Sequence, residues 1–294
     1  MPLVSHRLCS PIPCWRPEPS GLSPTRHSLD FINEAFECLD LIGWEHASAA
    51  LATIVAQMVA ARGAEESTAW RQPVDPVALC DAAAGEMSKV FAARQGVRAW
   101  SNHSALAREL LGDEPAKIVD ALKAAIPRGR RSCRPGTVPR YAAALRVARF
   151  GNANEHADCE TAHHVFTHAN ALHQMLRRIG AAGDGYLTAV RAIMHGAMAL
   201  YLARYLNVPP ARIPGENNDQ LDDLPVDAEV IRAALLDAFD RQRQVDLAAR
   251  LAARQLTLGR PPEVLIATLA HAAPREDAGF HAYQRRCQVV GSVT

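Results

Sequence analysis

The chain has 294 residues, of which 49% are hydrophobic and only 5% aromatic, and its formal net charge is +1. The near-neutral charge excludes the basic signature of nucleic-acid-binding proteins. Abundant alanine and few aromatic residues favour packed helices over sheets. We therefore predict an all-α protein whose partner is a small molecule or another protein rather than a nucleic acid.

Residues 1–28 are rich in proline and carry no hydrophobic periodicity, which predicts a disordered N-terminal lead-in. The remainder, 29–294, is predicted to be a single bundle-like domain of many helices. No apolar run reaches the roughly 20 residues of a membrane span, and the lead-in lacks the apolar core of a signal peptide. Seven scattered cysteines without a C-x-x-C pair argue against a disulfide framework and indicate a cytoplasmic protein.

The first half of the predicted domain shows clear helix-start signals. Asp75 and Asp113 are expected to cap helices, each followed within two residues by a proline in the first turn. The stretch 128–140, with five arginines, is predicted to be a loop, either a solvated surface or a site for an acidic partner or an anion. The helices predicted before this loop span residues 29–42, 44–62, 75–96 and 113–126.

The second half continues the helical pattern with one long interruption. Residues 208–225 contain four prolines, three of them within 209–214, and many acidic and amide residues, so we expect a loop there. Its role is either that of a lid or binding loop or that of a linker to the last helices. The helices predicted around it span residues 140–150, 156–179, 185–206, 226–256, 261–273 and 276–290.

Four of the twelve histidines fall in "AHHVFTHANALHQ", residues 162–174. His164 and His168 are four apart and share one helix face. Glu160 and His163 form an E-x-x-H pair, which is half of the signature that helical di-iron proteins carry twice. His173 lies far round the helix from His164, so one small site does not easily use both.

Other helices each place one histidine among apolar neighbours. One such histidine is usually a core residue, but histidines that converge from several helices are what a buried metal site requires. Carboxylates near them are further candidates, although Glu276 and Asp277 also fit a capping role in a first helical turn. The residues that we predict as metal ligands are His46, Glu66, His164, His168, His195, His271, Glu276 and His281.

Several motifs are missing from the sequence, and their absence narrows the chemistry. There is no H-E-x-x-H, G-x-S-x-G, Walker or G-x-G-x-x-G motif, which argues against zincin proteases, α/β-hydrolases and nucleotide-binding enzymes. There is also no C-x-x-C-H for covalent haem, and no pattern of Rieske cluster ligands.

Four stretches together resemble a group of helical, histidine-rich bacterial proteins, some of which carry a Rieske domain after the helical part. They are "GWEHASAAL", "ETAHHVFTHANALHQMLRR", "HGAMALYLARYLNVPPARIP" and "LAHAAPREDAGFHAYQ". The helical part is also distantly similar to questin oxidase-like proteins, which act on aromatic polyketides. This resemblance covers roughly residues 29–290 and implies an oxygen-using oxidase, with recurring histidines at His46, His164, His195, His271 and His281. Because this sequence has no Rieske ligands, we expect a separate electron-donor protein.

These observations leave three hypotheses. The first is a non-haem iron oxidase or oxygenase, a metal-dependent oxidoreductase with one or two iron ions, acting on a hydrophobic, aromatic or quinone-like molecule. The second is non-covalent haem binding by one or two of the same histidines. The third is a metal-free binding or scaffold protein, or an enzyme that uses histidine as a general base. We expect no membrane partner, and homodimerisation stays open.

Overall fold

The computed structural model describes residues 28–60, 74–93, 103–126, 134–151, 158–179, 185–206, 208–216, 221–241 and 244–275. Within these ranges the regular structure is helical and contains no strand, which confirms the all-α prediction. Residues 1–27 of the predicted lead-in and the predicted helix at 276–290 lie outside the described residues.

The chain forms two compact units, Met1–Pro210 and Ala211–Thr294, where the sequence predicted one helical domain. The division falls within the predicted loop at 208–225, where successive prolines prevent a helix from continuing. Each unit has its own hydrophobic core of buried side chains.

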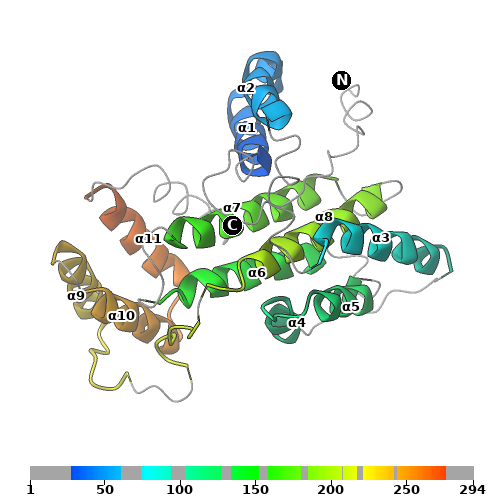
Figure 1. The fold of residues 1–294 in the computed structure, drawn as a ribbon. Coiled ribbons are helices and arrows are strands. Elements are labelled where there is room, and N and C mark those ends of the chain that lie inside the picture. Colours follow the sequence, from blue (N-terminus) through cyan, green and yellow to red (C-terminus); the bar gives the residue numbers. More distant parts are fainter. Residues whose placement is uncertain are drawn as a thin grey trace. The chain divides into compact units, whose positions relative to one another are not determined.

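The first unit is built around three helices that contact one another, α6 (Arg134–Ala148), α7 (Asp158–Ile179) and α8 (Gly185–Leu202) (Figure 1). Other helices pack on this trio: α1 on α7, α3 and α5 on α8, and α4 on α6, while α2 packs on α1. The bounds of these helices are Ser28–Ile42 (α1), Ala47–Ala60 (α2), Pro76–Ala93 (α3), His103–Leu110 (α4) and Pro115–Ala125 (α5).

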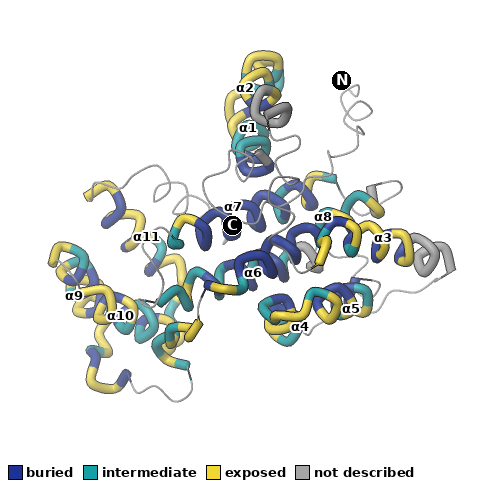
Figure 2. The backbone as a smooth tube through the Cα atoms, viewed as in Figure 1, coloured by how far each residue is buried: buried dark blue, intermediate teal, exposed yellow. Residues whose placement is uncertain are grey.

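Helix α7 is the most deeply enclosed helix of this unit. Every residue from Thr161 to Leu172 is buried, so the helix has no solvent-facing side along these three turns (Figure 2). A surface helix exposes one polar face, but α7 is contacted by α1, α6 and α8. The polar side chains of α7 are therefore part of the core of the unit.

The second unit contains α9 (Ala228–Asp240), α10 (Val245–Thr257) and α11 (Pro262–Ala272). Their buried side chains include Ile231, Leu235, Leu251 and Leu265. The single helix predicted at 226–256 is instead two helices. The sequence Arg-Gln-Arg-Gln at 241–244 supplies no apolar side chain for the core, and Arg241 already has an extended backbone.

Two further sequence predictions need correction, and one helix was not predicted. The basic stretch 128–140 is helical from Arg134 onward, with Pro139 inside α6 and buried. Asp113 is not an N-cap, because the residue that caps α5 is Glu114 and its side chain makes no capping hydrogen bond. Helix α4 was missed because its eight residues are too few for a periodic pattern to emerge.

The predicted cap at Asp75 is confirmed. Its Oδ1 accepts hydrogen bonds from the backbone N–H groups of Val77 (2.9 Å) and Ala78 (3.0 Å). These two bonds satisfy N–H groups that have no partner within a first helical turn.

Candidate functional site

Four histidines are buried in the core of the first unit. Three lie on α7, namely His163, His164 and His168, and one lies on α8, His195; their exposed fractions are 6%, 8%, 3% and 5%. The predicted deep burial of His195 is confirmed, since the neighbouring Met194 and Met198 are fully buried as well. The core of this unit thus contains an unusual number of imidazole rings among aliphatic side chains.

The packing of α7 against α8 explains why His168 and His195 are neighbours. A Cβ atom placed on Gly196 would lie only 2.4 Å from Cδ2 of Leu172, so the absent side chain permits a close approach of the two helices. His195 directly precedes Gly196, and His168 lies one turn before Leu172. The two imidazoles therefore belong to the same zone of contact.

The electrostatics of this zone keep His168 uncharged. Burial, and secondarily the positive form of His195, lower the pKa of His168 from its usual 6.5 to about 3. At neutral pH His168 is thus a neutral imidazole, which is the form that binds metals and accepts protons.

Two further polar contacts involve His163 and the backbone of His164. The Sγ atom of Cys159 lies 3.5 Å from Nε2 and 3.7 Å from Nδ1 of His163. The hydroxyl of Thr167 donates a 3.3 Å hydrogen bond to the backbone carbonyl of His164. Glu160 is exposed, so the Glu160–His163 pair does not point together into the core as a di-iron motif would.

Two predicted ligands lie outside this cluster. The expected burial of His46 and His271 is wrong, because both residues are exposed. His46 belongs to the short 3-10 turn Trp44–His46 that joins α1 to α2, and His271 lies on α11 of the second unit. In α11 the buried positions are Leu265, Thr268 and Ala272, which leaves His271 on the solvent side.

Three more predicted ligands, Glu66, Glu276 and His281, lie outside the described residues, as does Asp277. Within the described ranges, no group of three or more His, Cys, Asp or Glu side chains is arranged to hold a metal ion. The described donors are therefore the neighbouring pair His168 and His195, with His164 one turn away from His168 on α7. Imidazole nitrogens are suitable ligands for iron, so the chemical type of these donors fits a metal site. The number of described donors is too small to complete one.

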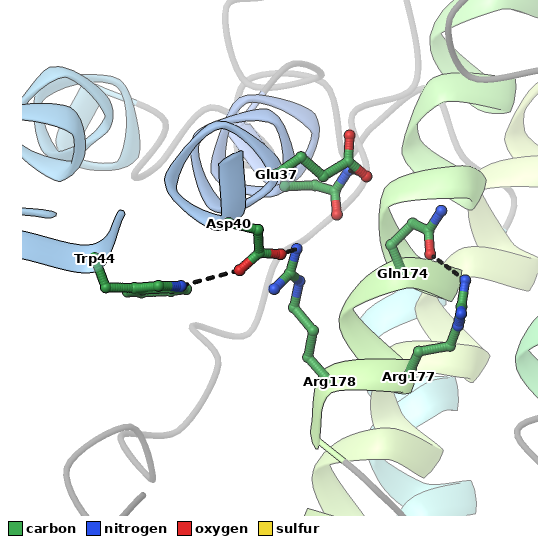
Figure 3. Close-up of polar contacts among 7 residues, drawn as sticks. Glu37, Asp40, Trp44, Gln174, Arg177 and Arg178 are labelled. Atoms are coloured by element: carbon green, nitrogen blue, oxygen red, sulfur yellow. Dashed lines mark hydrogen bonds and ion pairs between the residues drawn. The ribbon is translucent and has the colours of Figure 1, made fainter. Parts of the chain in front are cut away.

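Helix α1, which packs on α7, carries a polar stripe that was not predicted from the sequence. Asp30 and Asn33 are fully buried, and Asn33 donates a 2.8 Å hydrogen bond to Oε1 of Glu37. Farther along, Asp40 accepts hydrogen bonds from Arg178 of α7 (2.6 Å) and from Nε1 of Trp44 (2.9 Å) (Figure 3). These polar positions are three to four residues apart, and this spacing is the sequence signal that could have predicted a polar face on the helix.

No helix of the described ranges combines the length and the apolar character that crossing a membrane would require. No disulfide links the three cysteines within those ranges, Cys38, Cys80 and Cys159. Comparisons with models of protein families, with curated proteins and with solved structures find no match for this chain.

Proposed function

We propose that this protein is an iron-dependent oxidase or oxygenase whose metal centre is built on His168 and His195. The supporting observation is that both imidazoles are buried among apolar side chains and that the charge of His195 acts on His168, whose pKa is about 3. A histidine that stays neutral over the whole physiological range keeps a ring nitrogen lone pair available to a metal.

The residues around this pair fit such a role. His164 lies one turn from His168 and is the next imidazole donor, and Met194 and Met198, close to His195 in the sequence of α8, are fully buried. Bound iron would supply the oxygen chemistry, and the protein would supply a dry, apolar pocket for a hydrophobic, aromatic or quinone-like substrate. Such a centre would need at least one further ligand beyond the described donors.

We also propose a cellular location, an electron donor and an oligomeric state for this enzyme. A reduced, cytoplasmic location agrees with the three described cysteines, Cys38, Cys80 and Cys159, being thiols. The electron donor would be a separate protein, as the sequence resemblance implies, and the functional form is either a monomer or a homodimer.

A second candidate, a metal-free protein, is favoured by a different observation. Within the described residues, no group of three or more His, Cys, Asp or Glu side chains is arranged to hold a metal ion, and two predicted ligands, His46 and His271, are exposed. In that case the buried histidines would be packing residues, or general bases toward a bound small molecule.

The deciding experiment measures metal content and the visible spectrum of the full chain purified without chelators. The iron proposal expects near-stoichiometric iron and no Soret band, with the iron lost in His168→Gln and His195→Gln. His271→Gln is the matched control, because it removes an exposed imidazole and should leave the iron in place. Circular dichroism establishes that each variant is folded.

Three other outcomes would overturn the iron proposal. A Soret band would assign the histidines to haem. Full iron occupancy in both His168→Gln and His195→Gln would mean that the metal is bound by other residues. Absence of metal and chromophore, even after anaerobic loading with iron, would favour the metal-free candidate.

A further inference from the structure

The three helices of the second unit leave a cavity of about 670 Å³ among them. Helices α9 and α10 pack on each other, and α11 contacts both (Figure 1). The end of α9 and the start of α10 form most of the cavity wall, and Leu269 of α11 completes it. The volume lies within the range of roughly 300–1,000 Å³ that small-molecule sites occupy.

Alanine side chains create this space. Ala238 of α9 and Ala248, Ala249 and Ala252 of α10 all line the cavity, whereas a close-packed interior would fill such positions with larger side chains. Leu269 is 37% exposed, so it presents apolar surface to the cavity that a ligand can cover. Covering apolar surface is favourable in proportion to its area, so the cavity favours an apolar ligand.

The charged side chains at the rim of the cavity neutralise one another. Arg241, which lines the cavity, forms an ion pair of 2.9 Å with Asp237. Asp240, which also lines it, forms an ion pair of 3.3 Å with Arg275. The charges of these two pairs sum to zero, so they do not compensate a charged ligand for the water that it loses on binding.

The first turn of α10 supplies hydrogen-bond donors at the same rim. Gln244, the N-cap residue, and Val245 line the cavity, and the side chain of Gln244 makes no capping hydrogen bond. The first backbone N–H groups of a helix have no partner within the helix and favour an oxygen acceptor. Asp246 already places a negative charge in this turn, so a neutral carbonyl oxygen fits better there than a second anion.

We propose that the cavity among α9, α10 and α11 binds an uncharged, mainly apolar small molecule that carries a carbonyl group. The apolar part of the ligand rests on the alanines, on Leu269 and on the ring of Phe239, which also lines the cavity. The carbonyl oxygen accepts a hydrogen bond from the first turn of α10.

This site belongs to the second unit and goes beyond the proposed oxidase function, whose histidines lie in the first unit. The test of the site requires neither iron nor turnover, so failure of one proposal leaves the other standing.

The test is a fluorescence titration of the full chain with prodan. Prodan is an uncharged dimethylaminonaphthalene that carries a ketone and emits at shorter wavelength in apolar surroundings. We expect saturable binding to a single class of site, with a shift of the emission to shorter wavelength.

Two relatives of prodan with the same ring system test the chemistry of the ligand by competition. Replacing the ketone with a carboxylate should weaken binding by about tenfold or more, because the rim does not compensate the added charge. Removing the ketone should weaken binding by about threefold or more, because the hydrogen bond to α10 is lost.

The variant Ala249→Leu locates the site. Its added carbon atoms fill the cavity from an exposed position of α10, where leucine is a good helix former, so prodan binding should weaken by about tenfold or more in a folded protein. Ala233→Leu is the matched control, because it makes the same change at an exposed position of α9 that does not line the cavity. Circular dichroism establishes that both variants are folded.

Three results would overturn the proposal. The first is a wild-type protein that causes no saturable shift of prodan emission. The second is an Ala249→Leu variant that binds prodan as tightly as Ala233→Leu does. The third is that the carboxylate or the ketone-free relative binds as tightly as prodan, since the ligand would then not be an uncharged carbonyl compound.

Discussion

The side chain of Leu172 on α7 fills the space that a side chain at position 196 on α8 would need. A Cβ atom at Gly196 would lie 2.4 Å from Cδ2 of Leu172, and Pro139 of α6 also comes within 3.8 Å of it. The three central helices of the first unit therefore meet at a residue without a side chain, directly beside His195.

This relationship predicts that Gly196→Ala destabilises the protein. Forcing a methyl group against a side chain that is only 2% exposed costs about 1–3 kcal/mol, which exceeds the gain of up to about 1 kcal/mol from replacing a helical glycine. The matched control is Gly85→Ala in α3, where an added Cβ would meet no atom within 4 Å. There the stability should rise by about 0.5–1 kcal/mol. Urea unfolding measures both; a rise in stability for Gly196→Ala would contradict the close packing.

The neutral state of His168 predicts a pH dependence of stability. Its pKa is lowered to about 3 in the folded protein, and in the unfolded chain it returns to about 6.5. Between these values the unfolded state binds more protons, so the stabilisation is present above pH 6.5 and is lost as the pH falls. The contribution to the slope approaches about 1.4 kcal/mol per pH unit.

Urea titrations between pH 7 and pH 4.5 test this prediction. His168→Gln should flatten the dependence of the unfolding free energy on pH, whereas His271→Gln, at an exposed position, should leave it as in the wild type. An unchanged slope in His168→Gln would mean that other groups cause it.

The contact of Arg178 with α1 predicts a modest coupling energy. Arg178 pairs with Asp40 at 2.6 Å and its guanidinium lies 5.6 Å from the centre of the Phe36 ring. The side chains of Arg178 and Asp40 are 29% and 46% exposed, so solvent screens the pair, and we expect less than about 1 kcal/mol of coupling. A double-mutant cycle with Asp40→Asn and Arg178→Met measures it by urea unfolding.

The same pair predicts the direction of an acid effect. The hydrogen bond from Arg178 is the main cause that lowers the pKa of Asp40. The coupling is therefore present at neutral pH and is lost as acid protonates the carboxyl group. A coupling energy that persists at a pH well below the usual pKa of aspartate would show that it does not depend on the negative charge of Asp40.

The N-cap of α9 predicts a local effect in the second unit. Oδ1 of Asp227 accepts hydrogen bonds from the N–H groups of Glu229 (2.9 Å) and Val230 (3.0 Å). Asp227→Ala should cost about 1 kcal/mol, whereas Asp227→Asn, which keeps an acceptor oxygen, should cost much less. Urea unfolding compares them; equal losses for both variants would show that the negative charge rather than the hydrogen bonds matters.

Much of the helical architecture was predictable from local patterns. The bounds of α1, α3, α7 and α11 follow hydrophobic spacing and proline signals to within a few residues, because these features act on neighbouring residues of the chain. The break between α9 and α10 and the extension of α6 back to Arg134 were not predicted. At the break, the polar sequence at 241–244 offers no side chain to the core, and in α6 the burial of Val138, Ala142 and Ala143 accompanies a helix that its arginines and prolines do not signal.

The same distinction between local pattern and tertiary contact holds for the candidate site. The sequence by itself determined that His164 and His168 share a helix face and that His195 is surrounded by apolar residues, because both follow from helix periodicity. Only the tertiary structure decided that His46 and His271 are exposed, and that His195 on α8 contributes to the charge environment of His168 on α7. Burial and charge environment depend on which helices pack together, and periodicity along one helix carries no information about its neighbours.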